Sequence, residues 1–157
     1  MQNILILGWH PVAGALLEEL AQTAEARGWS LAVAGAEALR EAAAYRDRVR
    51  ALTLEAGQTE ARAKRIALAA VVLDFLGAES QAELAREAIP FGTNVLSAAA
   101  PQEATRAQDA AARAERVLVL GGLEGSDAAR WLKAIALALD ERRTLHGVHA
   151  AADALPA

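Results

Sequence analysis

The chain has 157 residues, a length typical of one domain, and 54% of them are apolar, many being alanine. The formal net charge is −4 and aromatic residues make up only 4%, which argues against nucleic acid as a partner. Cysteine is absent, which excludes disulfides, thiol catalysis and cysteine-ligated metals and agrees with a cytoplasmic location. The longest apolar stretches fall far short of the ~20 residues of a membrane helix, so direct membrane insertion is not expected.

The first twenty residues predict a strand followed at once by a helix. Residues 3–7 (NILIL) are an apolar run with the length of a fully buried strand, and Gly8 interrupts it. Apolar residues at three- and four-residue spacing then predict a helix over residues 11–26, with Gly28 just beyond its end. Such a helix directs its free N–H groups and its positive dipole end toward the carboxyl edge of the sheet. That arrangement suits an anionic ligand.

The rest of the chain alternates apolar runs with helical patterns. Strands are predicted at 30–34, 49–54, 70–73, 93–98 and 116–120, and helices at 35–50, 60–67, 81–88, 101–115 and 127–141, with Thr59, Ser80 and Ser126 as N-caps. This alternation predicts an α/β fold, a Rossmann-like doubly wound sheet of six mostly parallel strands with helices on both faces. We assign residues 1–141 to this domain and residues 142–157 to a C-terminal tail that is helical or disordered.

The loop after the first strand is the main candidate binding site. Gly8 and Ala13 occupy the first and third positions of the dinucleotide fingerprint G-x-G-x-x-G/A. His10 replaces the middle glycine, which normally lets the backbone approach a pyrophosphate, so it either crowds that approach or contacts a phosphate or carboxylate directly. Trp9 and Gly14 complete the candidate loop. The alternative is a tight strand-to-helix turn that binds nothing and is held by a buried Trp9.

Four more residues are candidates at the same edge of the sheet. Glu37 lies near the end of the second strand, where the fingerprint places an acid for the ribose hydroxyls, but it equally suits the first turn of a helix. Gly57 and Thr59 follow the third strand. Gly57 would let a ligand approach the backbone closely; the alternative is that Gly57 only forms a turn and Thr59 caps the next helix. Asp74 follows the fourth strand as a ligand contact or a cap. Since no histidine or second acid lies within motif distance, no catalytic residue and no metal site are assigned.

These segments carry a resemblance to a known family. The segment NILILGWHPVAGALLEEL resembles the opening of the TrkA-N domains, also called RCK or KTN domains, which are regulatory nucleotide-binding domains of potassium transporters and channels. The Gly8-Trp9 pair is most similar to the CASTOR/POLLUX ion-channel branch. Residues 52–73 (LTLEAGQTEARAKRIALAAVVL) and 93–122 (TNVLSAAAPQEATRAQDAAARAERVLVLGG) are similar to later parts of that domain. The resemblance spans residues 3–139.

The resemblance implies a cytoplasmic, non-catalytic domain that senses a nucleotide or an ion for a potassium or other ion transport system. Its implied cofactor is NAD(H) or another adenine nucleotide. Its implied partners are a membrane ion transporter or channel subunit and further copies of the chain in a homodimer or higher oligomer. Gly8 and Ala13 take the family's phosphate-loop positions, and Gly57 and Thr59 take its turn after the third strand. The chain departs from the family at the middle glycine and at the acids after strands two and three.

Two other functions stay open from the sequence. Residues 71–84 (VVLDFLGAESQAEL) are weakly similar to the cofactor domain of dihydrodipicolinate reductase, which implies an NAD(P)-dependent oxidoreductase cofactor domain. A degenerate Rossmann domain could instead serve as an interaction or assembly module, with exposed leucines and Trp131 on a dimer face. Trp131 suits a core position equally well.

Overall fold

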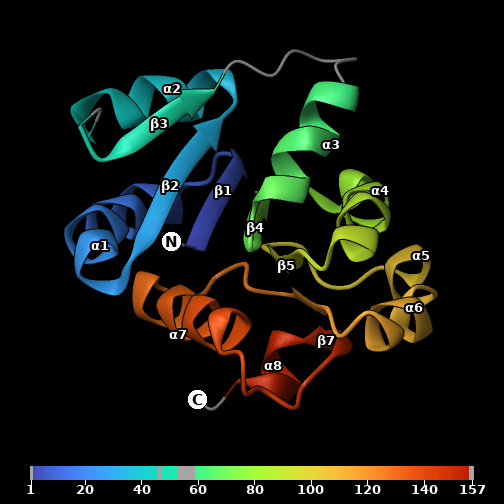
Figure 1. Cartoon of the computed structure of the whole chain (residues 1–157). Coiled ribbons are helices and arrows are strands. Elements are labelled where there is room, and N and C mark those ends of the chain that lie inside the picture. The colour runs from blue at the N-terminus through green and yellow to red at the C-terminus, as the bar shows by residue number, and fades with distance from the viewer. Residues whose placement is uncertain (1, 46, 53–58, 156–157) are drawn as a thin grey trace.

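The computed structural model describes residues 2–45, 47–52 and 59–155, and in this part of the chain seven parallel strands form one sheet (Figure 1). The order is β3-β2-β1-β4-β5-β6-β7, so the direction of winding reverses between β1 and β4. The strands are β1 (Gln2–Gly8), β2 (Trp29–Ala34), β3 (Val49–Leu52), β4 (Val71–Phe75), β5 (Asn94–Ser97), β6 (Leu118–Gly121) and β7 (Gly147–Ala150).

Helices cover both faces of the sheet. They are α1 (Pro11–Arg27), α2 (Ala36–Ala42), α3 (Thr59–Leu68), α4 (Ala78–Ala88), α5 (Glu103–Arg106), α6 (Asp109–Ala114), α7 (Ala128–Leu139) and α8 (Ala151–Ala154), with short 3-10 turns η1 (Ala43–Tyr45) and η2 (Ile89–Phe91). One apolar core joins the sheet to α1, α2 and α7, and a second core joins the other face to α3, α4 and α6. The predicted Rossmann-like doubly wound fold is therefore confirmed.

Local sequence explains the elements that position the site. All five residues of β4 are buried, as expected for a central parallel strand written as a continuous apolar run. Helix α1 buries Leu16, Leu17 and Leu20 on one face. It ends at Gly28, whose left-handed backbone (φ 70°) lets its N–H bond to the carbonyls of the last helical turn.

The tail contributes a seventh strand, so the predicted count of six was one too low. Residues 147–150, expected in a helical or disordered tail, form β7 and pair in parallel with β6. Hydrogen bonds hold this strand and the residues before it in place. The N–H of Val148 donates to Asp109 Oδ1 at 2.8 Å, and the Arg143 guanidinium donates to the carbonyls of Ala138 and Arg116.

Several predicted helix boundaries were wrong. Helix α4 begins at Ala78 after Gly77, so Ser80 lies inside its first turn and is not its N-cap. The cap of α7 is Asp127, whose carboxylate accepts from the N–H of Arg130 at 2.9 Å, and not Ser126. The helix expected over 101–115 is divided into α5 and α6, and the one expected over 35–50 is replaced by α2 and a 3-10 turn. Within the described ranges, no helix is both long and apolar enough to span a membrane.

Candidate functional site

Gly8 stands at the point where the winding of the sheet reverses. It is the last residue of β1 and pairs with Phe75 of the neighbouring strand β4. Its φ of 79° favours glycine, and a Cβ added there would lie 2.9 Å from the carbonyl oxygen of Phe75. Gly35, at the end of β2, also has positive φ, and a Cβ on it would lie 3.5 Å from Gly8 Cα. The ends of β1 and β2 thus approach each other closely, with no side chain between these two glycines.

His10 is the N-cap of α1. Its backbone is extended, and its Nδ1 accepts a hydrogen bond of 3.3 Å from the N–H of Val12. The His10 carbonyl accepts from the N–H of Ala13 at 2.8 Å, and Pro11 has no N–H to offer. In this conformation the first three residues of α1 therefore present no free amide hydrogen to an anion. The expected helix N-terminus exists, and its amides bond within the protein.

Aromatic rings stack behind this cap. The rings of His10 and Phe75 are nearly parallel with centroids 6.3 Å apart, and Phe75 packs on Trp131 at 4.7 Å. Trp131 is fully buried in the core, so the dimer-face alternative for this residue is wrong. Its indole N–H is buried and has no hydrogen-bond partner in the described part of the chain. Trp9 is half-buried against the same core, and its Cζ2 would lie 3.9 Å from a Cβ on Gly14.

The carboxylate of Asp74 is fully engaged within the protein. Asp74 is 1% exposed, its Oδ2 accepts from Ser97 Oγ at 2.7 Å, and its Oδ1 accepts from the N–H of Leu76 at 3.0 Å. Burial raises the pKa of Asp74, and the two hydrogen bonds and the Arg62 guanidinium oppose that increase. Asp74 therefore holds the loop that follows β4, which agrees with the cap alternative stated above.

The other candidate residues lie in different surroundings. Glu37 is exposed in the first turn of α2, where a carboxylate favours the helix N-terminus. Ala13 is buried on the core face of α1. Thr59 is the first residue of α3 and not the N-cap that the sequence predicted, and Gly57 lies outside the described residues. Within the described ranges, no group of three or more His, Asp or Glu residues could hold a metal ion.

Sequence reasoning missed three residues that shape this corner, namely Gly35, Phe75 and Ser97. Gly35 directly follows a predicted strand, which is a usable signal. Ser97 pairs with Asp74 in the register of β4 and β5, so its role depends on a strand alignment that a single sequence does not give. The ring contact of Phe75 with His10 joins distant parts of the chain and leaves no local pattern.

The chain resembles solved structures but matches no protein-family model and no curated protein. Saccharopine dehydrogenase (L-Glu forming) from Saccharomyces cerevisiae superposes with a TM-score of 0.70 at 21% identity, over 87% of this chain and 30% of that one. Shikimate dehydrogenase from Mycobacterium tuberculosis gives 0.56 at 21% identity, over 93% and 53%. An NAD-binding oxidoreductase from Klebsiella pneumoniae gives 0.56 at 17% identity, over 76% and 34%.

The chain has a Rossmann-type fold like that found in these oxidoreductases. It spans between about a third and about half of their length. The expected resemblance to TrkA-N domains is supported at the level of the Rossmann fold, and these neighbours give no support for a role in potassium transport.

Proposed function

We propose that this chain is the nucleotide-binding domain of an NAD(P)-dependent oxidoreductase and that it binds NAD(H) or NADP(H) beside Gly8. The observation that carries the proposal is the position of Gly8. It lies at the switch point between β1 and β4, and the 17-residue helix α1 begins three residues later. In open parallel sheets, ligands bind outside the carboxyl ends of the strands at such a point.

The residues near Gly8 fit a dinucleotide if the His10 side chain releases the N–H of Val12. Its hydrogen bond to Val12 is 3.3 Å long, beyond the usual range, whereas a phosphate oxygen makes a shorter, charge-assisted bond. His10 is only partly buried, so its ring can rotate away and leave the amide of Val12 facing the pyrophosphate. Gly35 and Glu37 would then lie on the side of the adenosine ribose. Bound nicotinamide supplies hydride transfer, and the protein supplies position and electrostatics.

A second candidate function is an interaction or assembly module that binds no nucleotide. The capped N-terminus of α1 and the stack of His10 on Phe75 favour it, because both fill the corner with protein groups. A regulatory domain on a membrane ion transporter or channel, acting as a homodimer or higher oligomer, is a third proposal. Only the sequence resemblance supports that one.

Titration with NADH, NADPH and ATP separates these functions. We expect NADH or NADPH to stabilise the chain, by about 2.7 kcal/mol at a hundredfold excess over Kd. His10→Gly restores the middle glycine of the fingerprint and, as a cap replacement, costs only a few tenths of a kcal/mol. It should bind the dinucleotide at least as tightly as the unaltered chain. Glu37→Gln removes the exposed carboxylate on the ribose side and should weaken binding of the dinucleotide.

The same titration can contradict the proposal. If the chain and His10→Gly both remain folded and neither responds to any of the three nucleotides at millimolar concentration, the cofactor role is wrong. The assembly module is then the better conclusion. Preference for ATP over both pyridine dinucleotides would instead favour the regulatory function.

A further inference from the structure

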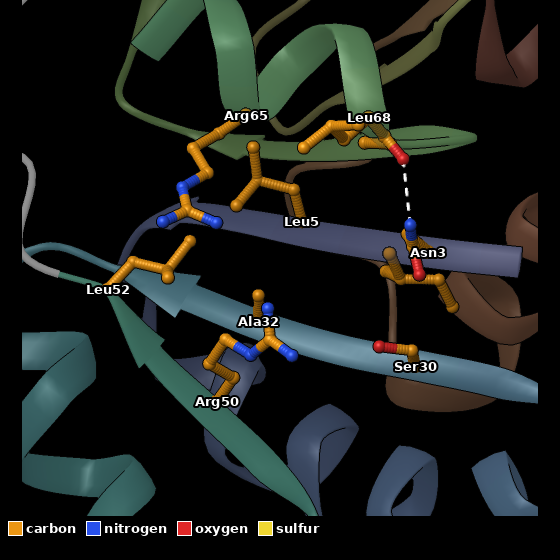
Figure 2. Close-up of a pocket in the computed structure, with 10 residues that line it drawn as sticks. Asn3, Leu5, Ser30, Ala32, Arg50, Leu52, Arg65 and Leu68 are labelled. Carbon is orange, nitrogen blue, oxygen red and sulfur yellow. Dashed lines mark hydrogen bonds between the residues drawn. The ribbon is translucent and has the colours of Figure 1, made fainter. Parts of the chain in front are cut away.

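A small groove flanked by two arginines lies on one face of the sheet. It is the hollow between α3 and the strands β2 and β3, with Leu5, Ala32 and Leu52 as its floor and Arg50 and Arg65 as its two sides, and we call it the β2–α3 groove. Figure 2 shows Arg65 reaching from α3 and Arg50 from β3 toward the same space above the floor. Its volume is about 180 Å³.

The two arginines differ from the other cations around them. Arg62, on the same helix as Arg65, is paired with Glu83 and Glu87, and Lys64 lies near Glu60. Neither Arg50 nor Arg65 forms an ion pair or a side-chain hydrogen bond with any other described residue. None of the described residues that line the groove is acidic, although the whole chain carries a net charge of −4. The groove therefore concentrates positive charge on a chain that is negative overall.

The floor and the far end of the groove add two further features. Leu5 and Leu52 line the floor of the groove, where they are 3% and 7% exposed. At the other end, the Asn3 side chain donates to the carbonyl of Leu68 and closes the groove, beside the hydroxyl of Ser30. Guanidinium groups bind carboxylates and phosphates in a fixed, two-pronged geometry, and an apolar floor suits a short hydrocarbon group.

We propose that the β2–α3 groove binds a small organic oxyanion, a carboxylate or phosphate monoester with a short apolar group. Arg50 and Arg65 hold the oxyanion, and Leu5 and Leu52 contact the hydrocarbon. The volume of 180 Å³ lies below the ~300–1,000 Å³ of pockets that enclose drug-sized ligands, so the groove suits a short oxyanion better than a whole dinucleotide. The groove runs from Asn3 and Ser30, early in their strands, to Leu52 at the end of β3. No described residue that lines the groove belongs to the nucleotide site proposed above.

Amide NMR titrations of the full chain test this site with four probes: butyl phosphate, hexanoate, inorganic phosphate and butanol. We expect butyl phosphate or hexanoate to shift amides at residues 3–5, 30–32 and 50–52, and the relative affinity of these two identifies the anion type. Inorganic phosphate and butanol, each lacking half of the ligand, should bind more weakly. Arg50→Gln and Arg65→Gln should each weaken binding about tenfold or more, since each loses a charged hydrogen bond.

Arg40→Gln is the matched control, because it removes the same charge from the exposed surface of α2 on the opposite face. It should bind as the unaltered chain does, and Arg65→Lys should retain part of the affinity. The proposal is overturned if Arg40→Gln weakens binding as much as Arg50→Gln, or if the shifts centre on residues 8–12. It is also overturned if the chain self-associates and Arg50→Gln abolishes the association, because the groove then holds a second copy.

Discussion

Ser97 Oγ donates a 2.7 Å hydrogen bond to Oδ2 of Asp74 and so joins the ends of β4 and β5 beneath the candidate site. The other carboxylate oxygen holds the N–H of Leu76, the first residue after β4. Both carboxylate oxygens of Asp74 thus bind protein groups and fix the loop next to Gly8 and Phe75. A residue placed in this way shapes the edge of the sheet without being available to a ligand.

Substitutions of Asp74 should separate its charge from its hydrogen bonds. Burial raises its pKa in the folded state, so the folded protein binds the proton more tightly than the unfolded chain. Stability should therefore rise as the pH falls through the folded-state pKa and level off below the unfolded value near 3.8. Asp74→Asn keeps an acceptor for Leu76, and it should match or exceed the original stability at neutral pH with a flatter pH profile. Asp74→Ala should lose about 1–3 kcal/mol, measured by urea unfolding.

The opposite result would assign a different role to this carboxylate. If Asp74→Asn unfolds as readily as Asp74→Ala, the negative charge itself is required. The interaction with Arg62 would then outweigh burial.

Gly8 and Gly14 should respond to alanine in opposite directions. Gly8→Ala places a Cβ 2.9 Å from the Phe75 carbonyl at a φ of 79°, and we expect a loss of about 2–4 kcal/mol. Gly14→Ala adds a methyl group inside α1, where the nearest side-chain atom is 3.9 Å away, and should gain about 0.5–1 kcal/mol. Thermal unfolding of both variants checks the pair. An equal effect at the two positions would contradict the close approach of β1 to β4.

The fold was largely predictable from sequence because most strands are apolar runs and most helices are amphipathic. β1 and β4 were recognised in this way, and Gly28 marked the end of α1. β7 was not, because its four residues, GVHA, contain one clearly apolar side chain. Its position depends on Asp109, 39 residues away in the sequence, and on contacts of the tail.

The candidate site was predictable in location and much less so in detail. The fingerprint positions led to the loop at Gly8, and the structure places that loop at the switch point of the sheet. The sequence predicted that His10 crowds a pyrophosphate or contacts a ligand directly, and its role as the N-cap of α1 was missed because it depends on the ring of Phe75 and on the extended backbone of His10. Alternatives that differ by a side-chain rotation leave no periodic signal in a sequence.

Arg143 should be the main attachment of the tail. Its guanidinium donates to Asn94 Oδ1 at 2.7 Å and to the carbonyls of Ala138, Arg116 and Leu145. Arg143→Gln should cost about 2 kcal/mol and speed hydrogen exchange in β7, because several carbonyls lose a charged donor. Arg142→Gln removes the same charge from the exposed neighbouring residue and should change stability little. Equal effects of the two variants would mean that net charge, and not these bonds, holds the tail.

Asp109 should make the attachment of β7 sensitive to acid. The hydrogen bond from the N–H of Val148 and the contact with Arg113 lower its pKa, so it stabilises the folded state above the unfolded value near 3.8. That contribution is lost as the pH falls through the lower, folded-state pKa. Asp109→Ala should speed amide exchange at Val148 at neutral pH, whereas Asp109→Asn keeps an acceptor for that amide and should preserve most of its protection.

Because a Cβ at Gly147 would collide with the Asp109 carboxylate, Gly147→Ala should loosen the same contact. Protection at Val148 that is unchanged in both Asp109→Ala and Gly147→Ala would show that β7 is held by its pairing with β6 alone.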